Sequence, residues 1–94
     1  MSVALTIRDQ IRITDRMAFG AWGAKEFVDM GNGLKFKTGG MTPWKGYVHI
    51  TYDEGHDLYK VDFFRIRDLK PVYDKRLEGV YCAQLVSVID DFVG

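Results

Sequence analysis

Residues 44–67 read WKGYVHITYDEGHDLYKVDFFRIR, and this stretch decides the fold. Its first part, 44–52, alternates apolar and polar residues with a period of two, which predicts a β-strand with one face on a core. The acidic, glycine-containing segment 53–57 predicts a turn. Alternation resumes over 58–67, so the stretch as a whole predicts a β-hairpin.

The alternation also assigns faces to these two strands. In the first strand Val48 and Ile50 point to the core, while Tyr47, His49 and Thr51 share the opposite face. In the second strand Tyr59, Val61 and Phe63 lie on one face, whereas Phe64 and Ile66 lie on the other. Because a slip of one residue turns a strand inside out, we expect a β-bulge at Phe63-Phe64 or a stretch that is buried on both faces.

The segments before this hairpin predict a helix and two more strands. Thr6 and Asp9 have the spacing of a capping box, which predicts a helix that begins near Thr6. Asp15 can cap a second helical turn, which should end between Gly20 and Gly23 because glycine destabilises a helix interior. Two alternating segments, 25–30 and 34–38, then flank the turn 31–33, Gly-Asn-Gly, which predicts a further hairpin.

After Pro71 the apolar residues take helical spacing and predict a C-terminal amphipathic helix that packs on one sheet face. Its stripe comprises Leu77, Val80, Tyr81, Leu85, Val88, Ile89 and Phe92, and Gly94 can end it. The charges near both ends of this predicted helix oppose the helix dipole, because Lys75 and Arg76 lie near its start and Asp90 and Asp91 near its end. We therefore expect these four residues to have partners elsewhere, with Arg65, Arg67 or a second subunit facing the aspartates.

Together these segments predict one α+β domain over residues 1–94: an N-terminal helix, a four-stranded antiparallel β-meander and the C-terminal helix. The chain has 13 basic and 13 acidic residues, so no global field draws it to nucleic acid or to a membrane. One cysteine excludes an internal disulfide, and no apolar run reaches the roughly 18 residues of a membrane span. We expect a soluble protein of a reducing, cytoplasmic compartment.

Candidate catalytic groups are few. His49 and His56, with Asp53, Glu54 and Asp57, could hold a divalent metal, but acidic residues and glycine also suit a hairpin turn and the spacing matches no metal motif. Cys82 could be a nucleophile, yet the predicted helix places it in a helix body, where a small buried residue is the simpler role. We therefore expect no catalytic residue, no metal and no cofactor, and a metal-dependent or thiol enzyme is the third hypothesis.

The candidate binding surface is a strand face that interleaves aromatic and basic side chains. It comprises Lys35, Lys37, Trp44, Lys45, Tyr47, His49, Arg65 and Arg67. Tyr, Trp and Arg are favoured in protein interfaces, so the leading hypothesis is a non-enzymatic interaction or structural protein that self-associates, as a dimer, through a sheet face or edge. The alternative is a module for single-stranded nucleic acid, because such proteins stack bases on aromatic rings and neutralise phosphates with basic residues.

Three segments carry a resemblance: AWGAK at 21–25, KGYV at 45–48 and VIDDFVG at 88–94. Through them the chain resembles small proteins of marine phages and of environmental sequences for which no function is established. The resemblance implies a phage or bacterial cytoplasm, and no site residue follows from it.

Overall fold

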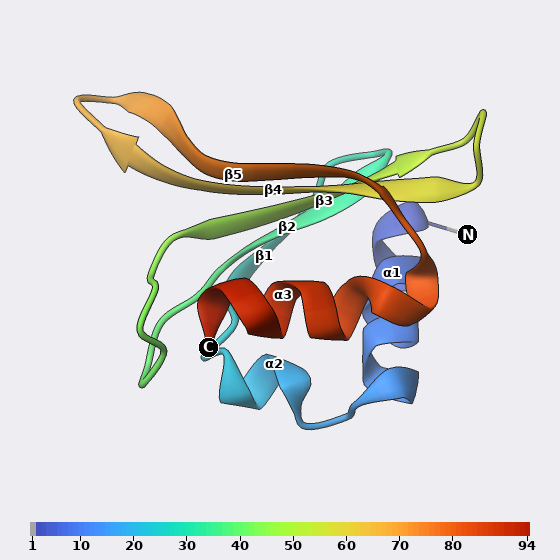
Figure 1. Ribbon diagram of the computed structural model, residues 1–94, viewed down its shortest axis with the longest axis horizontal. Helices are drawn as coiled ribbons and strands as arrows, with labels where there is room; N and C mark the ends of the chain where they lie inside the picture. Colours follow the sequence, from blue (N-terminus) through green and yellow to red (C-terminus); the bar gives the residue numbers. More distant parts are fainter. Residues whose placement is uncertain (1) are drawn as a thin grey trace.

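A computed structural model describes residues 2–94 and has two layers, a five-stranded antiparallel sheet and a layer of helices on one of its faces (Figure 1). The elements are α1 (Val3–Thr14), α2 (Ala18–Ala21), β1 (Lys25–Asp29), β2 (Gly33–Lys37), β3 (Tyr47–Asp53), β4 (Leu58–Arg67), β5 (Lys70–Val80), a 3₁₀ turn (Cys82–Gln84) and α3 (Leu85–Val93). The strands lie in chain order, so the predicted α+β class and antiparallel meander are confirmed. The predicted number of four strands is wrong, because β5 adds a fifth.

Helix α1 begins earlier than the sequence predicts. Ser2 is its N-cap, and the Ser2 hydroxyl accepts a hydrogen bond from the backbone N–H of Leu5 at 3.3 Å. The Thr6 hydroxyl instead donates to the Ser2 carbonyl at 3.2 Å. Serine is among the preferred N-cap residues, so it provides the start that we had assigned to Thr6. Ile7 and Ile11 are fully buried on the face that their spacing predicts.

The second helical segment ends where the glycines predict, since α2 stops at Ala21. Trp22 follows it and is 1% exposed, and its indole Nε1 donates to Asp90 Oδ1 on α3 at 3.2 Å. Asp90 therefore has the partner outside its own helix that we expected, but this partner is Trp22 and not Arg65 or Arg67. The bond ties the segment after α2 to the end of α3.

Both predicted hairpins are confirmed. Strands β1 and β2 pair up to Asp29 opposite Leu34, and the turn contains Gly31 at a φ of 82°, which favours glycine. Strands β3 and β4 pair throughout, from Tyr47 opposite Phe64 to Asp53 opposite Leu58.

The predicted irregularity at Phe63-Phe64 is also confirmed. Phe63 lies opposite Lys75 and Phe64 opposite Tyr73, so β5 has one extra residue, Asp74, at this point. Both phenylalanines are buried, Phe63 at 0% exposure and Phe64 at 9%. Phe63 faces the helices and Phe64 the other side, so this part of β4 is a bulged segment that buries side chains on both faces.

The predicted helix after Pro71 is wrong over residues 72–80, which belong to β5. A second register shift lies between Tyr59 opposite Val80 and Val61 opposite Leu77, and Gly79 at the extra position has a φ of 65°. Each bulge adds one residue to the strand and breaks its period of two. Leu77 and Val80 are consequently three apart, which is the spacing of a helix.

The C-terminal helix is confined to α3, where Leu85, Ile89 and Val93 are fully buried against the sheet. Lys75 and Arg76 are strand residues, so no helix dipole opposes them. The core between the two layers also contains Ile7, Ile11, Trp22, Phe36, Val48, Ile50, Val61 and Phe63.

Candidate functional site on the uncovered sheet face

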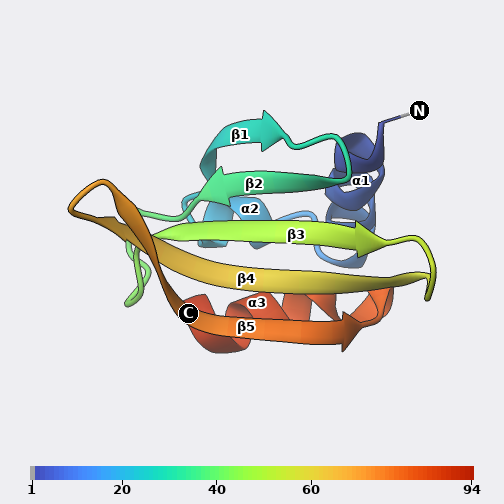
Figure 2. The same cartoon turned by 90° about the horizontal axis from the view of Figure 1, so that it is seen from above.

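The helices all lie on one side of the sheet, and the other side is uncovered by any element among residues 2–94 (Figure 2). Strand pairing arranges two rows of side chains across this face. One row runs Lys37, Tyr47, Phe64, Tyr73 over β2 to β5, and the other runs Lys35, His49, Asp62, Arg76 over the same strands. We call Tyr47, Phe64 and Tyr73 the aromatic row.

The rings of the aromatic row contact one another. Tyr47 and Phe64 are stacked with centroids 5.3 Å apart and planes at 16°, and Phe64 and Tyr73 are 5.5 Å apart at 48°. The middle ring is the most buried, with Phe64 at 9% exposure, whereas Tyr47 is half-buried and Tyr73 is 45% exposed. Because Tyr47 and Phe64 turn their ring faces toward each other, these rings present mainly their edges to solvent.

Cations lie at both ends of the aromatic row. The Nζ atoms of Lys35 and Lys37 are 5.6 and 5.8 Å from the centroid of the Tyr47 ring, and Arg76 Cζ is 4.2 Å from that of Tyr73. These distances are within the range of cation–π attraction. Each end of the aromatic row therefore lies next to at least one cationic side chain.

The second row is polar and partly neutralised. Arg76 Nε donates to Asp62 Oδ1 at 3.1 Å. Burial lowers the pKa of His49, and Lys35 lowers it further, whereas Asp62 opposes both effects. Since the ordinary histidine pKa of about 6.5 is already below neutrality, His49 is uncharged at pH 7. Beside this row, Lys60 Nζ is 3.8 Å from Glu78 Oε1.

The structure brings together most of the sequence-predicted binding residues. Lys35, Lys37, Tyr47 and His49 lie on the uncovered face, as their alternation predicts. Lys37 and Tyr47, with Lys45 and Arg65, line one hollow of about 330 Å³ at the end of the face where β3 begins. Three of these four side chains are cationic.

Arg67 and Trp44 lie apart from this set. Arg67 is exposed at the end of the β4–β5 hairpin, opposite Lys70. Trp44 packs on the helical side, with ring centroids 5.1 Å from Phe92 and 5.8 Å from Phe63. It is a part of the core boundary and does not lie on the uncovered face.

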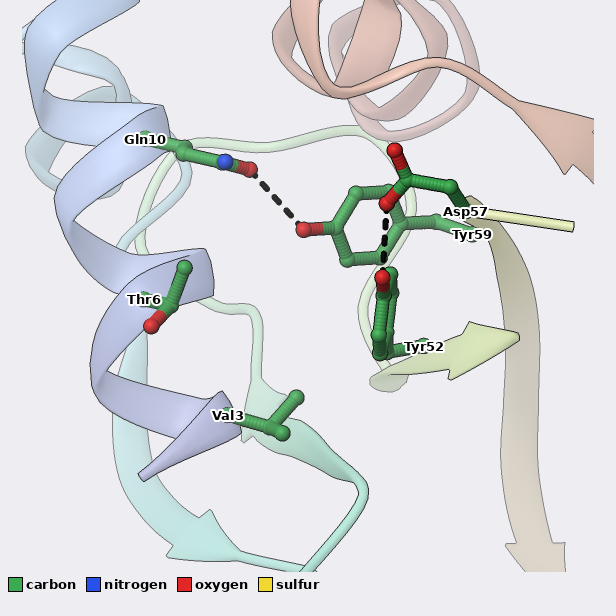
Figure 3. Close-up of a pocket in the computed structure, with 6 residues that line it drawn as sticks. All are labelled: Val3, Thr6, Gln10, Tyr52, Asp57 and Tyr59. Atoms are coloured by element: carbon green, nitrogen blue, oxygen red, sulfur yellow. Dashed lines mark hydrogen bonds between the residues drawn. The ribbon is translucent and has the colours of Figure 1, made fainter. Parts of the chain in front are cut away.

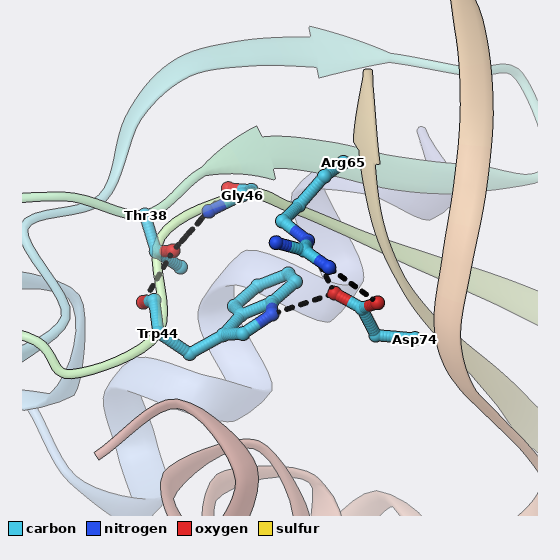
Figure 4. Close-up of polar contacts among 5 residues, drawn as sticks. All are labelled: Thr38, Trp44, Gly46, Arg65 and Asp74. Carbon is cyan, nitrogen blue, oxygen red and sulfur yellow. Dashed lines mark hydrogen bonds and ion pairs between the residues drawn. The ribbon is translucent and has the colours of Figure 1, made fainter. Parts of the chain in front are cut away.

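Trp44 is held by a polar cluster (Figure 4). Its Nε1 donates to Asp74 Oδ2 at 2.9 Å, and Arg65 binds the same carboxylate through Nε at 2.7 Å and Nη2 at 3.0 Å. The pKa of Asp74 is lowered, first by Arg65 and then by Trp44. The buried Thr38 hydroxyl accepts from the Gly46 N–H at 3.1 Å, which fixes the chain just before β3. Arg65 is thus partly neutralised, and Lys37 and Lys45 carry most of the free charge of the hollow.

A second hollow, of about 260 Å³, lies between α1 and the β3–β4 hairpin (Figure 3). Its polar groups bind each other: the Tyr52 hydroxyl donates to Asp57 Oδ1 at 2.6 Å and the Tyr59 hydroxyl donates to Gln10 Oε1 at 3.0 Å. Asp57 raises the pKa of Tyr52 to about 12. These bonds tie the hairpin together and join it to α1, which is a structural role.

The residues that could form a catalytic site are only partly brought together. His49 is on the uncovered face, whereas His56 lies in the β3–β4 turn and bonds Asp53 Oδ2 at 2.9 Å. His56 and Cys82 line a common hollow at the edge of the molecule. Cys82 is exposed at the start of the 3₁₀ turn, so its predicted place in a helix body is wrong. Among residues 2–94, no three His, Cys, Asp or Glu side chains gather as metal ligands.

Sequence reasoning missed Tyr73, Arg76 and Asp62 as parts of this face. Tyr73 and Arg76 fall in the segment that we assigned to a helix, whereas Asp62 lies opposite His49 within the predicted β3–β4 hairpin and could have been placed from that pairing. The overlooked signal is Gly79, which would be costly inside a helix but is favoured at its bulge position.

Comparison of the chain with protein-family models, with curated proteins and with solved structures gives no match. Within residues 2–94, no helix is both long enough and apolar enough to cross a bilayer.

Proposed function

We propose that this protein is a non-enzymatic interaction protein that self-associates as a symmetric dimer through the uncovered face of its sheet. The observation that carries the proposal is the aromatic row on a face that no helix within residues 2–94 covers. Tyrosine, phenylalanine and arginine are enriched in the centres of protein interfaces. The free, exposed Cys82 fits a reducing compartment, so we place the protein in the cytoplasm. The resemblance carried by 21–25, 45–48 and 88–94 implies that this is a phage or bacterial cytoplasm.

The sheet edges are less suited to pairing than the face. The β1 edge is five residues long and contains a bulge, with Glu26 at a φ of 55°. The β5 edge is longer, but two bulges and Pro71, which lacks an N–H, interrupt it. Bulges and proline are the features by which natural sheets prevent edge pairing. Of the two contacts predicted for self-association, a sheet face or a sheet edge, we therefore propose the uncovered face.

The order of the rows also fits a two-fold pairing of two copies. A two-fold axis parallel to the strands would place the β2 side of one copy over the β5 side of the other. Each residue keeps its level along the strands under this rotation, so the two aromatic rows would lie over each other and run in opposite directions, with Lys37 of one copy over Tyr73 of the other. In the next row Lys35 would lie over the ion pair of Arg76 with Asp62.

Light scattering with a matched pair of variants tests this dimer. Tyr73→Glu adds a charge to the 45% exposed end of the aromatic row, and Ile13→Glu makes the same kind of change at an 84% exposed residue of α1. We expect a dimer mass at tens of micromolar for the wild type and for Ile13→Glu, and a monomer mass for Tyr73→Glu. A monomeric wild type at that concentration would refute the proposal.

A second candidate function is binding of single-stranded nucleic acid. The specific observation in its favour is the hollow lined by Lys37, Lys45, Tyr47 and Arg65, in which cations could contact phosphates. It is less favoured than the dimer because Tyr47 and Phe64 cover each other's ring faces, which a base would need for stacking.

Fluorescence anisotropy of a labelled oligonucleotide separates the two candidates. Nucleic-acid binding predicts a salt-sensitive rise in anisotropy that weakens in Lys45→Ala and is unchanged in Arg16→Ala, since Arg16 is exposed in the loop before α2. Constant anisotropy at low salt would eliminate this candidate and leave the dimer proposal unaffected.

A further inference from the structure

A groove between α1 and the β1 edge has the composition of a binding site for a small ligand. Its volume is about 290 Å³, and it lies on the helical side of the molecule. Its lining residues are Ala4, Leu5, Arg8 and Arg12 of α1, Phe27 and Asp29 of β1, and Leu34 of β2. The volume is close to the lower limit of small-molecule sites, about 300 Å³, so the ligand must be small.

The body of the groove is apolar. Ala4 and Leu34 are each 4% exposed and form its floor, while Leu5 at 44% and Phe27 at 46% keep part of their apolar surface in contact with solvent. The Phe27 ring is held in place by Phe19, at a centroid distance of 5.2 Å and a plane angle of 87°, and by Phe36. An apolar ligand body would therefore meet a preformed surface.

Two cations stand beside this apolar surface with little to neutralise them. Arg8 and Arg12 are four residues apart, so they project from the same flank of α1. The nearest carboxylate of Arg8 is Asp9, at 3.7 Å and with a side chain that is 60% exposed, which is a weak surface contact. Within residues 2–94, Arg12 has no carboxylate within ion-pair distance.

Arg8 also has an unmet hydrogen-bonding need. Its Nε is shielded from solvent and has no acceptor among residues 2–94. Buried donors in proteins nearly always have a partner, so such an atom beside a groove indicates a missing acceptor. A carboxylate placed between Arg8 and Arg12 would accept from Arg8 and would relieve the repulsion between the two guanidinium groups.

Asp29 limits the ligand to one negative charge. Its carboxylate accepts from the Gly31 N–H at 2.8 Å and from the Ser2 hydroxyl at 2.9 Å, and these bonds lower its pKa, so it stays ionised. Through Ser2 it is tied to the N-terminal end of α1, whereas Arg12 is near the C-terminal end. A second anionic group at the Asp29 end would be repelled.

From these observations we propose that the groove between α1 and β1 binds a small amphipathic monocarboxylate, with its carboxylate at Arg8 and Arg12 and its hydrocarbon chain on Leu5 and Phe27. The site is on the opposite side of the sheet from the aromatic row, so the proposal does not depend on self-association.

Titration of the ¹⁵N-labelled protein with octanoate, followed by NMR, tests the site. We expect saturable shifts in α1 and β1 with an affinity in the millimolar range, as suits so few ligand atoms. Octanamide, which keeps the chain and loses the charge, should bind at least about tenfold more weakly, because bonds to a charged acceptor are the stronger ones.

Substitutions of the two arginines test where the carboxylate of the ligand binds. Arg12→Gln should weaken octanoate binding by about tenfold or more, and Arg8→Gln should do the same, since each removes a charge-assisted bond. Arg16→Gln, which removes a cation outside the groove, should leave the affinity unchanged. The absence of saturable shifts, equal binding of octanamide, or unchanged binding in folded Arg12→Gln would each overturn the proposal.

Discussion

Replacing Gly33 with alanine probes the pairing of β2 with β3, which places Lys35 and Lys37 beside His49 and Tyr47. A Cβ on Gly33 would overlap the carbonyl oxygen of Ile50, and it would lie 3.0 Å from both the Ile50 carbonyl carbon and Thr51 Cα, where ordinary contacts begin at 3.4 Å. These atoms belong to the backbone of the neighbouring strand. The clash can be relieved only if β2 and β3 move apart.

The expected loss in the free energy of unfolding is the sum of three effects of this substitution. Overpacking costs about 1–3 kcal/mol. The Tyr52 N–H to Asn32 carbonyl bond, 2.8 Å long and directly beside Gly33, contributes about 1 kcal/mol if it is lost. The lower unfolded-state entropy of alanine returns about 0.5–1 kcal/mol. We therefore expect Gly33→Ala to lower the free energy of unfolding by about 2 kcal/mol, or the melting temperature by about 8–16 °C.

Thermal and urea unfolding, followed by circular dichroism, measure this change against a matched control. Gly20→Ala makes the same substitution in α2, where a Cβ meets no atom within 4 Å, and it should raise stability by about 0.5–1 kcal/mol. The two variants should therefore move in opposite directions. If Gly33→Ala were as stable as the wild type, the register of β2 on β3 would be wrong, together with the rows of the uncovered face.

Three further predictions concern local structure. Leu69 is 97% exposed at a φ of 63°, so Leu69→Gly should stabilise the protein by about 0.5–1 kcal/mol in urea unfolding, and a loss would contradict the left-handed turn. Ultraviolet titration should show that the pKa of Tyr52, about 12, falls toward 10 in Asp57→Asn, and an unchanged pKa would exclude the Tyr52–Asp57 hydrogen bond. Because the folded pKa is raised, the stability that this bond contributes is complete below about pH 10 and is lost as the pH rises through 12. Lys35→Gln should raise the pKa of His49 in an NMR titration, and an unchanged pKa would show that Lys35 does not act on His49. Because burial lowers the pKa of His49 in the folded state, protonation of His49 reduces the stability of the protein as the pH falls below about 6.5.

The regular parts of the fold could be predicted from sequence because their side-chain periods are undisturbed. Val48 and Ile50 face the core and Tyr47 and His49 face outward, as the strict alternation of β3 requires. The slip at Phe63-Phe64 was visible for the same reason, since it interrupts a clear pattern. Local alternation was sufficient wherever a strand pairs without extra residues.

Strand β5 could not be predicted in this way. Its bulges at Asp74 and Gly79 place Leu77 and Val80 at helical spacing, and the β4–β5 turn uses Asp68 and Leu69 at positive φ without any glycine. Periodicity therefore indicated a helix, and the usual hairpin signal was missing.

The candidate site was predicted only on one side for the same reason. Lys35, Lys37, Tyr47 and His49 come from the strands that alternation identified, whereas Tyr73 and Arg76 come from β5. Trp44 was grouped with this site although the alternation of 44–52 puts it on the core side, with Val48 and Ile50. In the structure its ring lies on the helical side, where Phe92 and Phe63 pack on it.

The most direct test of the central claim is an NMR dilution series that follows the aromatic side-chain and backbone signals of the unmodified protein. Self-association through the uncovered face predicts concentration-dependent shifts that centre on Tyr47, Phe64 and Tyr73, with the buried side of the sheet unchanged. Shifts confined to α1 or to the strand edges, or signals independent of concentration up to the solubility limit, would contradict the account.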